Sequence, residues 1–302
     1  MPRLIDPGAG DPIGLEDLIE AIENCGLDLR DEDALASLGP LLARLGRNRS
    51  FLGDLVIAEL KARCAGQGVD NAYGAQVFML KPSNGRYMLR ANFWPAPGDA
   101  ALRASGRAAF FYDLPHDHNF SFLTVGYQGP GYWSDYYEYD RGAVIGMPGE
   151  AAGLRFVERS QLTEGKVLLY RAGRDIHAQL PPEAMSVSLN ILAYDRAQPW
   201  REQYRFDLAT GTIAAGLTVA PSEALVAIAA HFGGEDVARD FAARHPVPRM
   251  RVTALVALAS AMPLRTDRLA LFEAAADDPD ANVAGHARLR IAAIEQAARL
   301  SP

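Results

Sequence analysis

The feature that most constrains the fold is a succession of short strand-like runs between residues 73 and 208, separated by glycine and proline turns. Pro82–Gly85 is typical of a hairpin turn, because Asn-Gly readily takes positive φ, and Gly129–Gly131 marks another turn. Many short strands of this kind predict a β-sandwich or a barrel. The predicted strands are Ala75–Leu80, Tyr87–Trp94, Ala109–Asp113, Asn119–Tyr127, Tyr132–Tyr139, Lys166–Tyr170 and Ser186–Tyr194.

Helical patterns precede and follow this β region. Residues 12–68 repeat apolar positions at helical spacing, and residues 221–302 are rich in alanine. We therefore expect an N-terminal helical segment over 1–72, a β-barrel over 73–215 and a C-terminal helical domain over 216–302.

Two stretches of the C-terminal region are alike. Residues 248–255 and 280–287 each place a short polar entry before an apolar helix. The second resembles the entry of a HEAT-type helical repeat, and arrays of such repeats commonly bind peptides or proteins. A plain helical cap is the alternative.

Composition narrows the partners and the compartment. The formal net charge is −7 and the sequence pI is about 5.4, which argues against a nucleic-acid partner, since that needs a basic surface. The N-terminus lacks the apolar core of a signal peptide, and we find no uncharged apolar run long enough for a membrane span. Cys25 and Cys64 are the only cysteines, so we expect a cytoplasmic protein without a disulfide framework.

Three histidines of the β region form a candidate metal site. His116 and His118 are two residues apart where a strand begins, so both imidazoles point to one face while Asp117 points away. His177 would supply a third ligand from a distant strand. Three imidazoles suit Fe(II), Zn, Ni or Cu and leave coordination positions open, as in catalytic sites. The alternative is that these are structural histidines of the core.

The two histidine motifs resemble those of the cupin superfamily. His116 and His118 match the His-x-His of its first motif, and Gly165, Gly173 and His177 match the second, with Arg171 where proline is usual. The resemblance covers roughly residues 75–208. It implies a double-stranded β-helix, or jelly roll, around a metal site.

The glutamate of the first motif is missing, because Phe122 and Leu123 occupy its place. A site of three histidines without a carboxylate resembles the thiol dioxygenase branch of the cupins, which binds iron(II). In that branch an arginine on an early strand holds the substrate carboxylate, and Arg90 stands at the matching spacing. On the late strand Asn190 replaces the branch's histidine, and Tyr194 is displaced by about two positions from the usual tyrosine.

The residues around the histidines are strongly aromatic. Tyr127 and Tyr132 flank the Gly129–Gly131 turn, and with Tyr194 they are candidate catalytic residues that orient a substrate or transfer a proton. Packing in the barrel core is the alternative. Arg90 and Asn190 are the candidate substrate-binding residues.

From these observations we predict a mononuclear iron(II) oxygenase that uses O2 on a small-molecule or amino-acid-derived substrate. Two alternatives remain. One is a cupin that binds a ligand without oxygen chemistry, as a sensor or an isomerase-like protein. The other is a peptide-tailoring protein whose helices recognise its partner. No membrane partner is expected, and the oligomeric state is left open.

Overall fold

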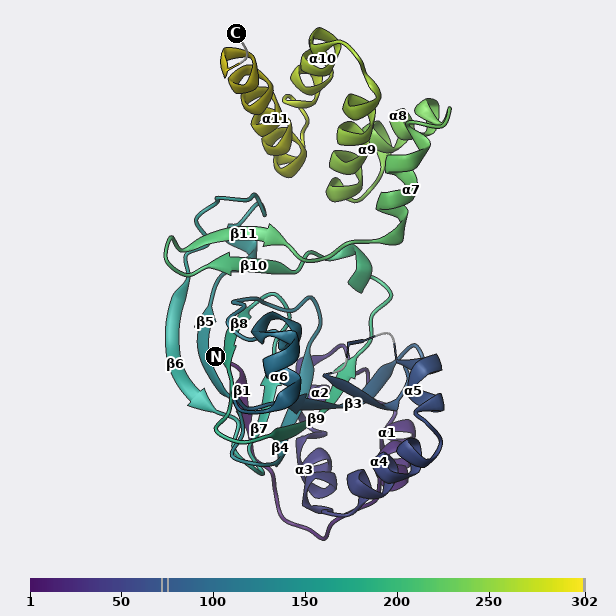
Figure 1. The fold of residues 1–302 in the computed structure, drawn as a ribbon, viewed down its shortest axis with the longest axis vertical. Helices are drawn as coiled ribbons and strands as arrows, with labels where there is room; N and C mark the ends of the chain where they lie inside the picture. Colours follow the sequence, from purple (N-terminus) through teal and green to yellow (C-terminus); the bar gives the residue numbers. More distant parts are fainter. Residues whose placement is uncertain (72, 75, 301–302) are drawn as a thin grey trace. The chain divides into compact units, whose positions relative to one another are not determined.

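The computed structural model describes residues 1–71, 73–74 and 76–300, so the first residue of the predicted strand Ala75–Leu80 lies outside the described residues. The chain divides into two compact units, and the N-terminal helices belong to the same unit as most of the strands (Figure 1). The first unit comprises Met1–Arg141, Ala152–Gln198 and Gln203–Thr212; the second comprises Gly142–Ala151, Pro199–Glu202 and Ile213–Pro302.

The larger sheet of the first unit has six strands in the order β1-β7-β4-β9-β3-β2, and neighbouring strands in it are antiparallel. The long β3–β9 ladder runs without interruption from one end of both strands to the other. The strands are β1 (Arg3–Ile5), β2 (Val77–Lys81), β3 (Tyr87–Trp94), β4 (Phe122–Gln128), β7 (Val167–Tyr170) and β9 (Ser186–Ala193).

The second sheet has the order β6-β5-β8, formed by β5 (Trp133–Glu138), β6 (Arg155–Gln161) and β8 (Asp175–Leu180). Isolated bridges from Tyr112 to Gln179 and from His116 to His177 place residues 112–116, which precede β4, beside β8. A separate two-stranded sheet pairs β10 (Tyr204–Asp207) with β11 (Thr212–Gly216).

The chain alternates between the two main sheets. From β3 in the six-stranded sheet the chain crosses to the bridged stretch beside β8 and returns to β4 in the six-stranded sheet. It then forms β5 and β6 in the three-stranded sheet. After that, β7 and β9 lie in the six-stranded sheet and β8, between them in sequence, lies in the three-stranded sheet. This order of alternation defines a double-stranded β-helix, or jelly roll. The predicted fold class, a mainly β core of this type with helices before and after it, is confirmed.

The two faces of the six-stranded sheet bury different residues, because side chains alternate along a strand. Leu89, Leu123 and Leu169 lie on the face that packs with the N-terminal helices, whereas Phe122 and Tyr170 lie on the face that packs with Tyr136 of β5. The jelly-roll interior is therefore the second of these faces. The helices of this unit are α1 (Leu15–Asn24), α2 (Glu32–Ala36), α3 (Gly39–Arg47), α4 (Phe51–Lys61), α5 (Ala65–Asp70) and α6 (Ala100–Ser105).

One predicted strand, Ala109–Asp113, is wrong. Residues Arg107–Phe110 form the 3-10 helix η1, and Phe111 and Asp113 follow with φ of 57° and 59°. Positive φ at two residues this close together prevents a continuous ladder. The guanidinium of Arg107 also donates to the Asp113 carboxylate, at 2.8 Å for its Nη2, which closes the turn.

The second unit contains five helices in the part of the chain described here. Small and apolar residues such as Ala238, Met250, Ala254 and Leu258 fill the space between α7, α8 and α9. No described helix combines the length and the hydropathy needed to cross a membrane. The helices are α7 (Pro221–Ala229), α8 (Glu235–Arg244), α9 (Pro248–Ala261), α10 (Arg265–Ala275) and α11 (Ala281–Leu300); short 3-10 turns occur at η2 (Arg141–Ala143) and η3 (Gln198–Trp200).

The turn between β4 and β5 supplies a test of this packing. Gly131 has φ of 86°, and a Cβ there would overlap the carbonyl group of Leu162, whereas Gly85 has φ of 85° with open space around it. Gly85→Ala should cost about 1 kcal/mol from its backbone conformation. Gly131→Ala should cost at least about 3 kcal/mol, because backbone must also move. Urea unfolding of both variants measures the difference, and equal losses would contradict the close packing at Gly131.

Candidate metal centre

The backbones of His116 and His177 hold the centre together. The N–H of His116 donates to the His177 carbonyl at 3.1 Å, and the N–H of His177 donates to the His116 carbonyl at 3.0 Å. Two residues that exchange both bonds in this way lie directly opposite each other on one face. This pairing therefore brings the two imidazoles together although 61 positions separate them in the chain.

His118 is positioned by the turn before β8. The N–H of Gly173 donates to the His118 carbonyl at 2.7 Å, and Gly173 has φ of 63°. The predicted turn at Gly173 thus connects the two histidine motifs, because its backbone anchors the first motif while the chain continues into His177 of the second.

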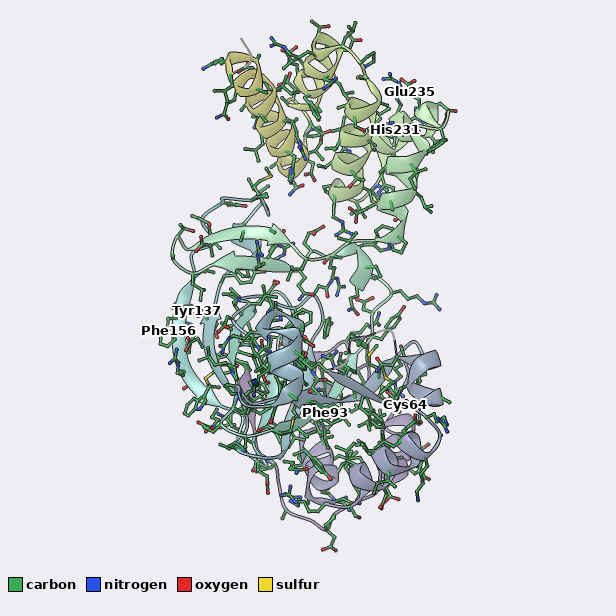
Figure 2. All side chains as sticks on the ribbon, viewed as in Figure 1. Cys64, Phe93, Tyr137, Phe156, His231 and Glu235 are labelled. Carbon is green, nitrogen blue, oxygen red and sulfur yellow. The ribbon has the colours of Figure 1, made fainter. Side chains whose placement is uncertain are left out.

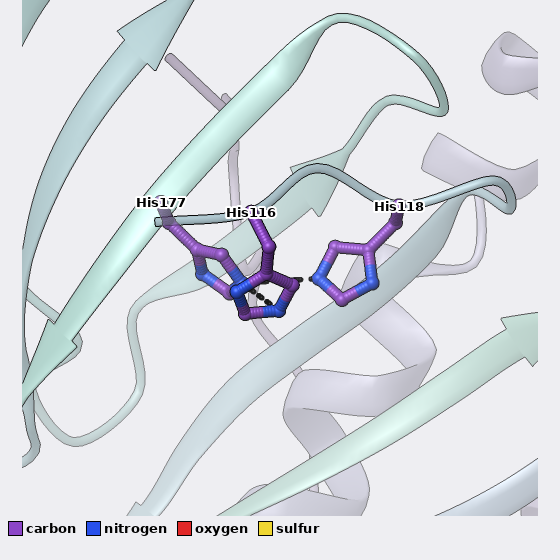
Figure 3. A group of neighbouring side chains, drawn as sticks. All are labelled: His116, His118 and His177. Carbon is purple, nitrogen blue, oxygen red and sulfur yellow. Dashed lines mark hydrogen bonds between the residues drawn. The ribbon is translucent and has the colours of Figure 1, made fainter. Parts of the chain in front are cut away.

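The three imidazoles converge through their Nε2 atoms (Figure 3). Nε2 of His177 lies 3.0 Å from Nε2 of His118 and 3.3 Å from Nε2 of His116. Nitrogen ligands about 2.1 Å from an ion and about 90–110° apart would themselves be separated by about 3.0–3.4 Å. Among the described residues, the cluster of His116, His118 and His177 thus has the donor set and the spacing of a site that can hold a metal ion.

Burial keeps these imidazoles in the form that binds metals. It lowers the pKa of His116 to about 4, and it lowers the pKa of His118 and His177 well below the ordinary value. The neighbouring histidines add to the lowering at His118 and His177, and the charge of Arg90 adds to it at His118. Neutral imidazoles with free lone pairs are the ligands that a metal ion requires.

One hydrogen bond also selects a tautomer. Nδ1 of His116 donates to the Leu114 carbonyl at 2.7 Å, which leaves the lone pair on Nε2. The buried carboxylate of Asp117 points away from the cluster, as the alternation predicts. It accepts hydrogen bonds from the Tyr139 hydroxyl at 2.5 Å and from the Tyr204 N–H at 2.6 Å, and so anchors the segment that carries His116 and His118.

No carboxylate replaces the missing glutamate of the first motif among the described residues of the cluster. The ring of Phe122, at one of the two matching positions, packs against the ring of His118 with centroids 4.9 Å apart. Leu123, at the other, lies on the face that packs with the helices. Three neutral donors therefore leave the full charge of a divalent ion in the interior.

The six-stranded sheet presents polar side chains to this interior. Arg90, Asn190 and Thr124 lie opposite one another on β3, β9 and β4. Each has a buried polar atom without a hydrogen-bond partner among the described residues: Nε of Arg90, Nδ2 of Asn190 and Oγ1 of Thr124. Buried polar groups are normally paired in a folded protein, so this row has the character of a binding surface.

Arg90 forms no ion pair with a carboxylate of the described chain. Its guanidinium carbon lies 5.0 Å from the centroid of the Tyr73 ring, and burial lowers the pKa of the guanidinium. An ion pair with a local acid would be another way to satisfy an interior arginine, but none forms among the described residues. The structure places Arg90 and Asn190 on the interior face.

Tyr132, one of the candidate catalytic residues, lies in the aromatic interior. Its ring packs on Trp94 at a centroid distance of 4.0 Å, and its hydroxyl interacts with Tyr170. Burial raises its pKa far above the ordinary value, so the hydroxyl remains protonated.

Tyr127 and Tyr194 are not brought to the histidines. The Tyr127 hydroxyl donates to the Asn48 carbonyl at 3.0 Å, and its ring packs on Phe51 among the helices. Tyr194 follows the end of β9, and its N–H donates to the Arg86 carbonyl at 3.0 Å. Tyr127 faces the helices because it stands five positions after the interior residue Phe122, and residues an odd number of positions apart on a strand point to opposite faces.

Three residues near the cluster were not predicted. The Tyr170 ring lies 4.9 Å from the His177 ring, and its hydroxyl shares a 3.0 Å hydrogen bond with Tyr136. Nε2 of Gln179 lies 3.2 Å from Nε2 of His177. The sequence pattern could have identified Gln179, because residues two positions apart on a strand lie on the same face and Gln179 is two positions after His177.

The other histidines lie outside the cluster. In the second unit, for example, Nε2 of His231 lies 3.0 Å from the Ser260 hydroxyl (Figure 2). The predicted metal site thus uses three of the six histidines of the sequence.

Among known proteins, the chain is similar to solved structures alone. No protein-family model matches the sequence, and no curated protein matches it. Among the solved structures are the DMSP lyase DddQ from Ruegeria pomeroyi DSS-3, at 11% identity and a TM-score of 0.24 over 65% of this chain and 78% of that one, and vicilin from Corylus avellana (hazelnut), at 12% identity and a TM-score of 0.23 over 46% and 34%.

A third match belongs to the crystal structures of the DMSP lyases RdDddP and RnDddQII, at 11% identity and a TM-score of 0.23 over 40% of this chain and 44% of that one. This chain spans less than half the length of that protein and of the hazelnut vicilin. The TM-scores are low, and the chemistry of the site rests on this chain's own residues.

The lowered pKa of His116 predicts a loss of stability in acid. Its unfolded pKa is near 6.5 and its folded pKa about 4, so between these values the unfolded chain binds the proton and the folded chain does not. The free energy of unfolding of the metal-free protein should therefore decrease as the pH is lowered through this range, by up to about 3 kcal/mol from His116 alone.

Comparison with His116→Gln isolates that contribution, because burial raises the pKa of Asp117 and gives that group the opposite pH dependence. Urea unfolding at several pH values measures it. Identical pH dependence in the two proteins would contradict the prediction.

Proposed function

We propose that this protein is a mononuclear non-haem iron(II) oxygenase that uses O2 on a small molecule carrying a carboxylate, such as an amino-acid derivative. The observation that carries the proposal is the convergence of three neutral imidazoles, with Nε2 separations of 3.0 and 3.3 Å, in a jelly-roll interior. His116, His118 and His177 would hold the iron. Three protein ligands leave open positions, at which the metal, when bound, supplies the binding and activation of O2.

Arg90 and Asn190 would bind the substrate. The guanidinium of Arg90 has five donors in a planar fork that matches a carboxylate. Among the described residues its neighbour is the Tyr73 ring, and no acidic side chain interacts with it. Asn190 adds an unpaired amide on the neighbouring strand, directly opposite Arg90. A carboxylate there would remove the cost of an interior charge without a partner.

The interior tyrosines would act as hydrogen-bond donors. Burial raises the pKa of Tyr136 to about 12 and raises that of Tyr170 well above its ordinary value. Hydroxyls with such pKa values do not serve as bases near neutral pH. The paired hydroxyls of these residues and of Tyr132 would instead orient a polar substrate beside His177 and exclude water with their rings.

A cupin that binds a ligand without oxygen chemistry is the alternative for the same site. It would use the same ligands and the same polar row without consuming O2. The proposed partners are thus a small-molecule substrate and O2, with a peptide as the alternative bound through the helices α7–α11. A cytoplasmic location and the absence of a nucleic-acid or membrane partner remain predictions.

The proposal is tested first by metal content and O2 uptake. Protein purified without added metal should contain iron, and it should consume O2 with at least one member of a panel of amino acids and their derivatives. His177→Ala should weaken metal binding by more than about 100-fold, since loss of a ligand costs more than loss of a supporting hydrogen bond. His231→Ala is the control, because its imidazole bonds to Ser260 in the second unit.

Iron that persists in folded His177→Ala would contradict the ligand assignment. A protein that contains metal but consumes no O2 with any member of the panel would favour the ligand-binding alternative.

The role of Arg90 is tested separately. Arg90→Lys keeps the charge but loses the planar fork, so the apparent affinity for a substrate found in the panel should fall about tenfold or more, or ~1.4 kcal/mol. Iron content should not change, because Arg90 is not in the histidine cluster. Arg159→Lys, which alters an exposed pair with Asp135, is the control. Unaltered kinetics with a lowered melting temperature would reject Arg90 as the anchor.

A further inference from the structure

Gln179 shares the interior face of β8 with His177. The two residues are two positions apart on one strand, so their side chains point the same way. The Gln179 backbone is held on both sides, since Asp113 N–H donates to its carbonyl at 2.9 Å and Ser134 lies directly opposite on β5. Gln179 is only 4% exposed, so its amide is confined to the interior beside the histidine cluster.

The amide contacts the atom through which His177 would bind a metal ion. Nε2 of Gln179 lies 3.2 Å from Nε2 of His177, the same nitrogen that approaches His116 and His118. Oε1 of Gln179 is buried and has no hydrogen-bond partner among the described residues. A buried amide oxygen left unpaired next to three converging nitrogens indicates that a group outside the described chain completes its interactions.

The two ends of a glutamine amide have nearly the same shape, and a half-turn about the last side-chain bond exchanges them. If an amide N–H of Gln179 faces His177, the lone pair on Nε2 of His177 accepts that hydrogen bond and cannot bind a metal ion. With the oxygen in that position, an amide oxygen instead lies beside Nε2 of His177, the nitrogen that is 3.0 and 3.3 Å from Nε2 of His118 and His116. The second orientation satisfies the donor set of a metal site.

We propose that Gln179 is a fourth protein ligand, through its amide oxygen, of the ion held by His116, His118 and His177. This rests on the metal centre of the proposed function. The oxygen donor takes the place of the carboxylate that the first motif lacks, yet it is neutral, so the bound ion keeps its two positive charges. A mixed nitrogen and oxygen donor set favours Fe(II) or Mn(II) over ions that prefer sulfur.

The retained charge also bears on the substrate. A divalent ion with four neutral ligands, and with Arg90 on the facing sheet, gives an interior that attracts anions. An amide ligand thus favours a negatively charged substrate more than a glutamate ligand would, since a glutamate would cancel one of the charges.

The test is a titration of the metal-free, full-length protein with Co(II), followed by visible absorption. Gln179→Leu removes both ends of the amide, so its Co(II) affinity should fall at least tenfold and its absorption spectrum should change. Gln179→Glu retains an oxygen ligand and adds a charge, so its affinity should equal or exceed that of the unaltered protein. Ser134→Ala is the matched control, because Ser134 lies directly across the ladder and its buried Oγ likewise has no hydrogen-bond partner among the described residues. This variant should bind Co(II) as the unaltered protein does.

Gln179→Glu separates a ligand from a residue that only supports His177. If the amide acts by donating its N–H to His177, a carboxylate cannot donate and Gln179→Glu should weaken binding as Gln179→Leu does; that result would overturn the proposal. Unchanged affinity and spectrum in folded Gln179→Leu would also overturn it. If Gln179→Leu does not fold, Gln179→Glu decides alone: retained or tightened binding supports the proposal and weakened binding rejects it. No Co(II) binding by the unaltered protein would instead reject the metal centre itself.

Discussion

The pair of backbone hydrogen bonds between His116 and His177 is the constraint on which the site depends. It places the first histidine motif beside β8 at one register, and a shift of one residue would turn the imidazole of either partner to the opposite face. His118, two residues further along, is held by the hydrogen bond from Gly173 N–H to its carbonyl. The convergence of the three Nε2 atoms is thus a consequence of backbone pairing.

The two faces of the six-stranded sheet differ: the outer face is apolar and packs with helices, and the inner face carries polar side chains. Its outer face buries Leu89, Leu123 and Leu169 together with the N-terminal helices, which supplies the hydrophobic driving force for this unit. Its inner face carries Arg90, Asn190 and Thr124, whose burial without partners costs free energy. Packing on one face allows the other face to keep buried polar groups without partners among the described residues.

Charge is arranged consistently around the histidines. Burial keeps the imidazoles neutral and the tyrosines protonated, and no described carboxylate joins the cluster. A divalent ion would therefore keep most of its charge, and the guanidinium of Arg90 adds to it on the facing sheet. Both features favour an anionic substrate, and a neutral ligand at Gln179 would preserve them.

The sequence by itself indicated a core of many short strands with helices before and after it, because period-two alternation and glycine turns are local properties of the chain. The jelly roll and the grouping of His177 with His116 and His118 followed from the resemblance of the two histidine motifs to those of the cupins. The same resemblance singled out Arg90 and Asn190, but the structure decided that both lie on the interior face. Only the tertiary structure decided that Tyr127 faces the helices, that η1 replaces the strand predicted over Ala109–Asp113, and that Gln179 and Tyr170 adjoin His177. Each of these depends on which strands pair, at which register and with which face inward. Distant segments settle such choices through hydrogen bonds and packing that no local pattern records.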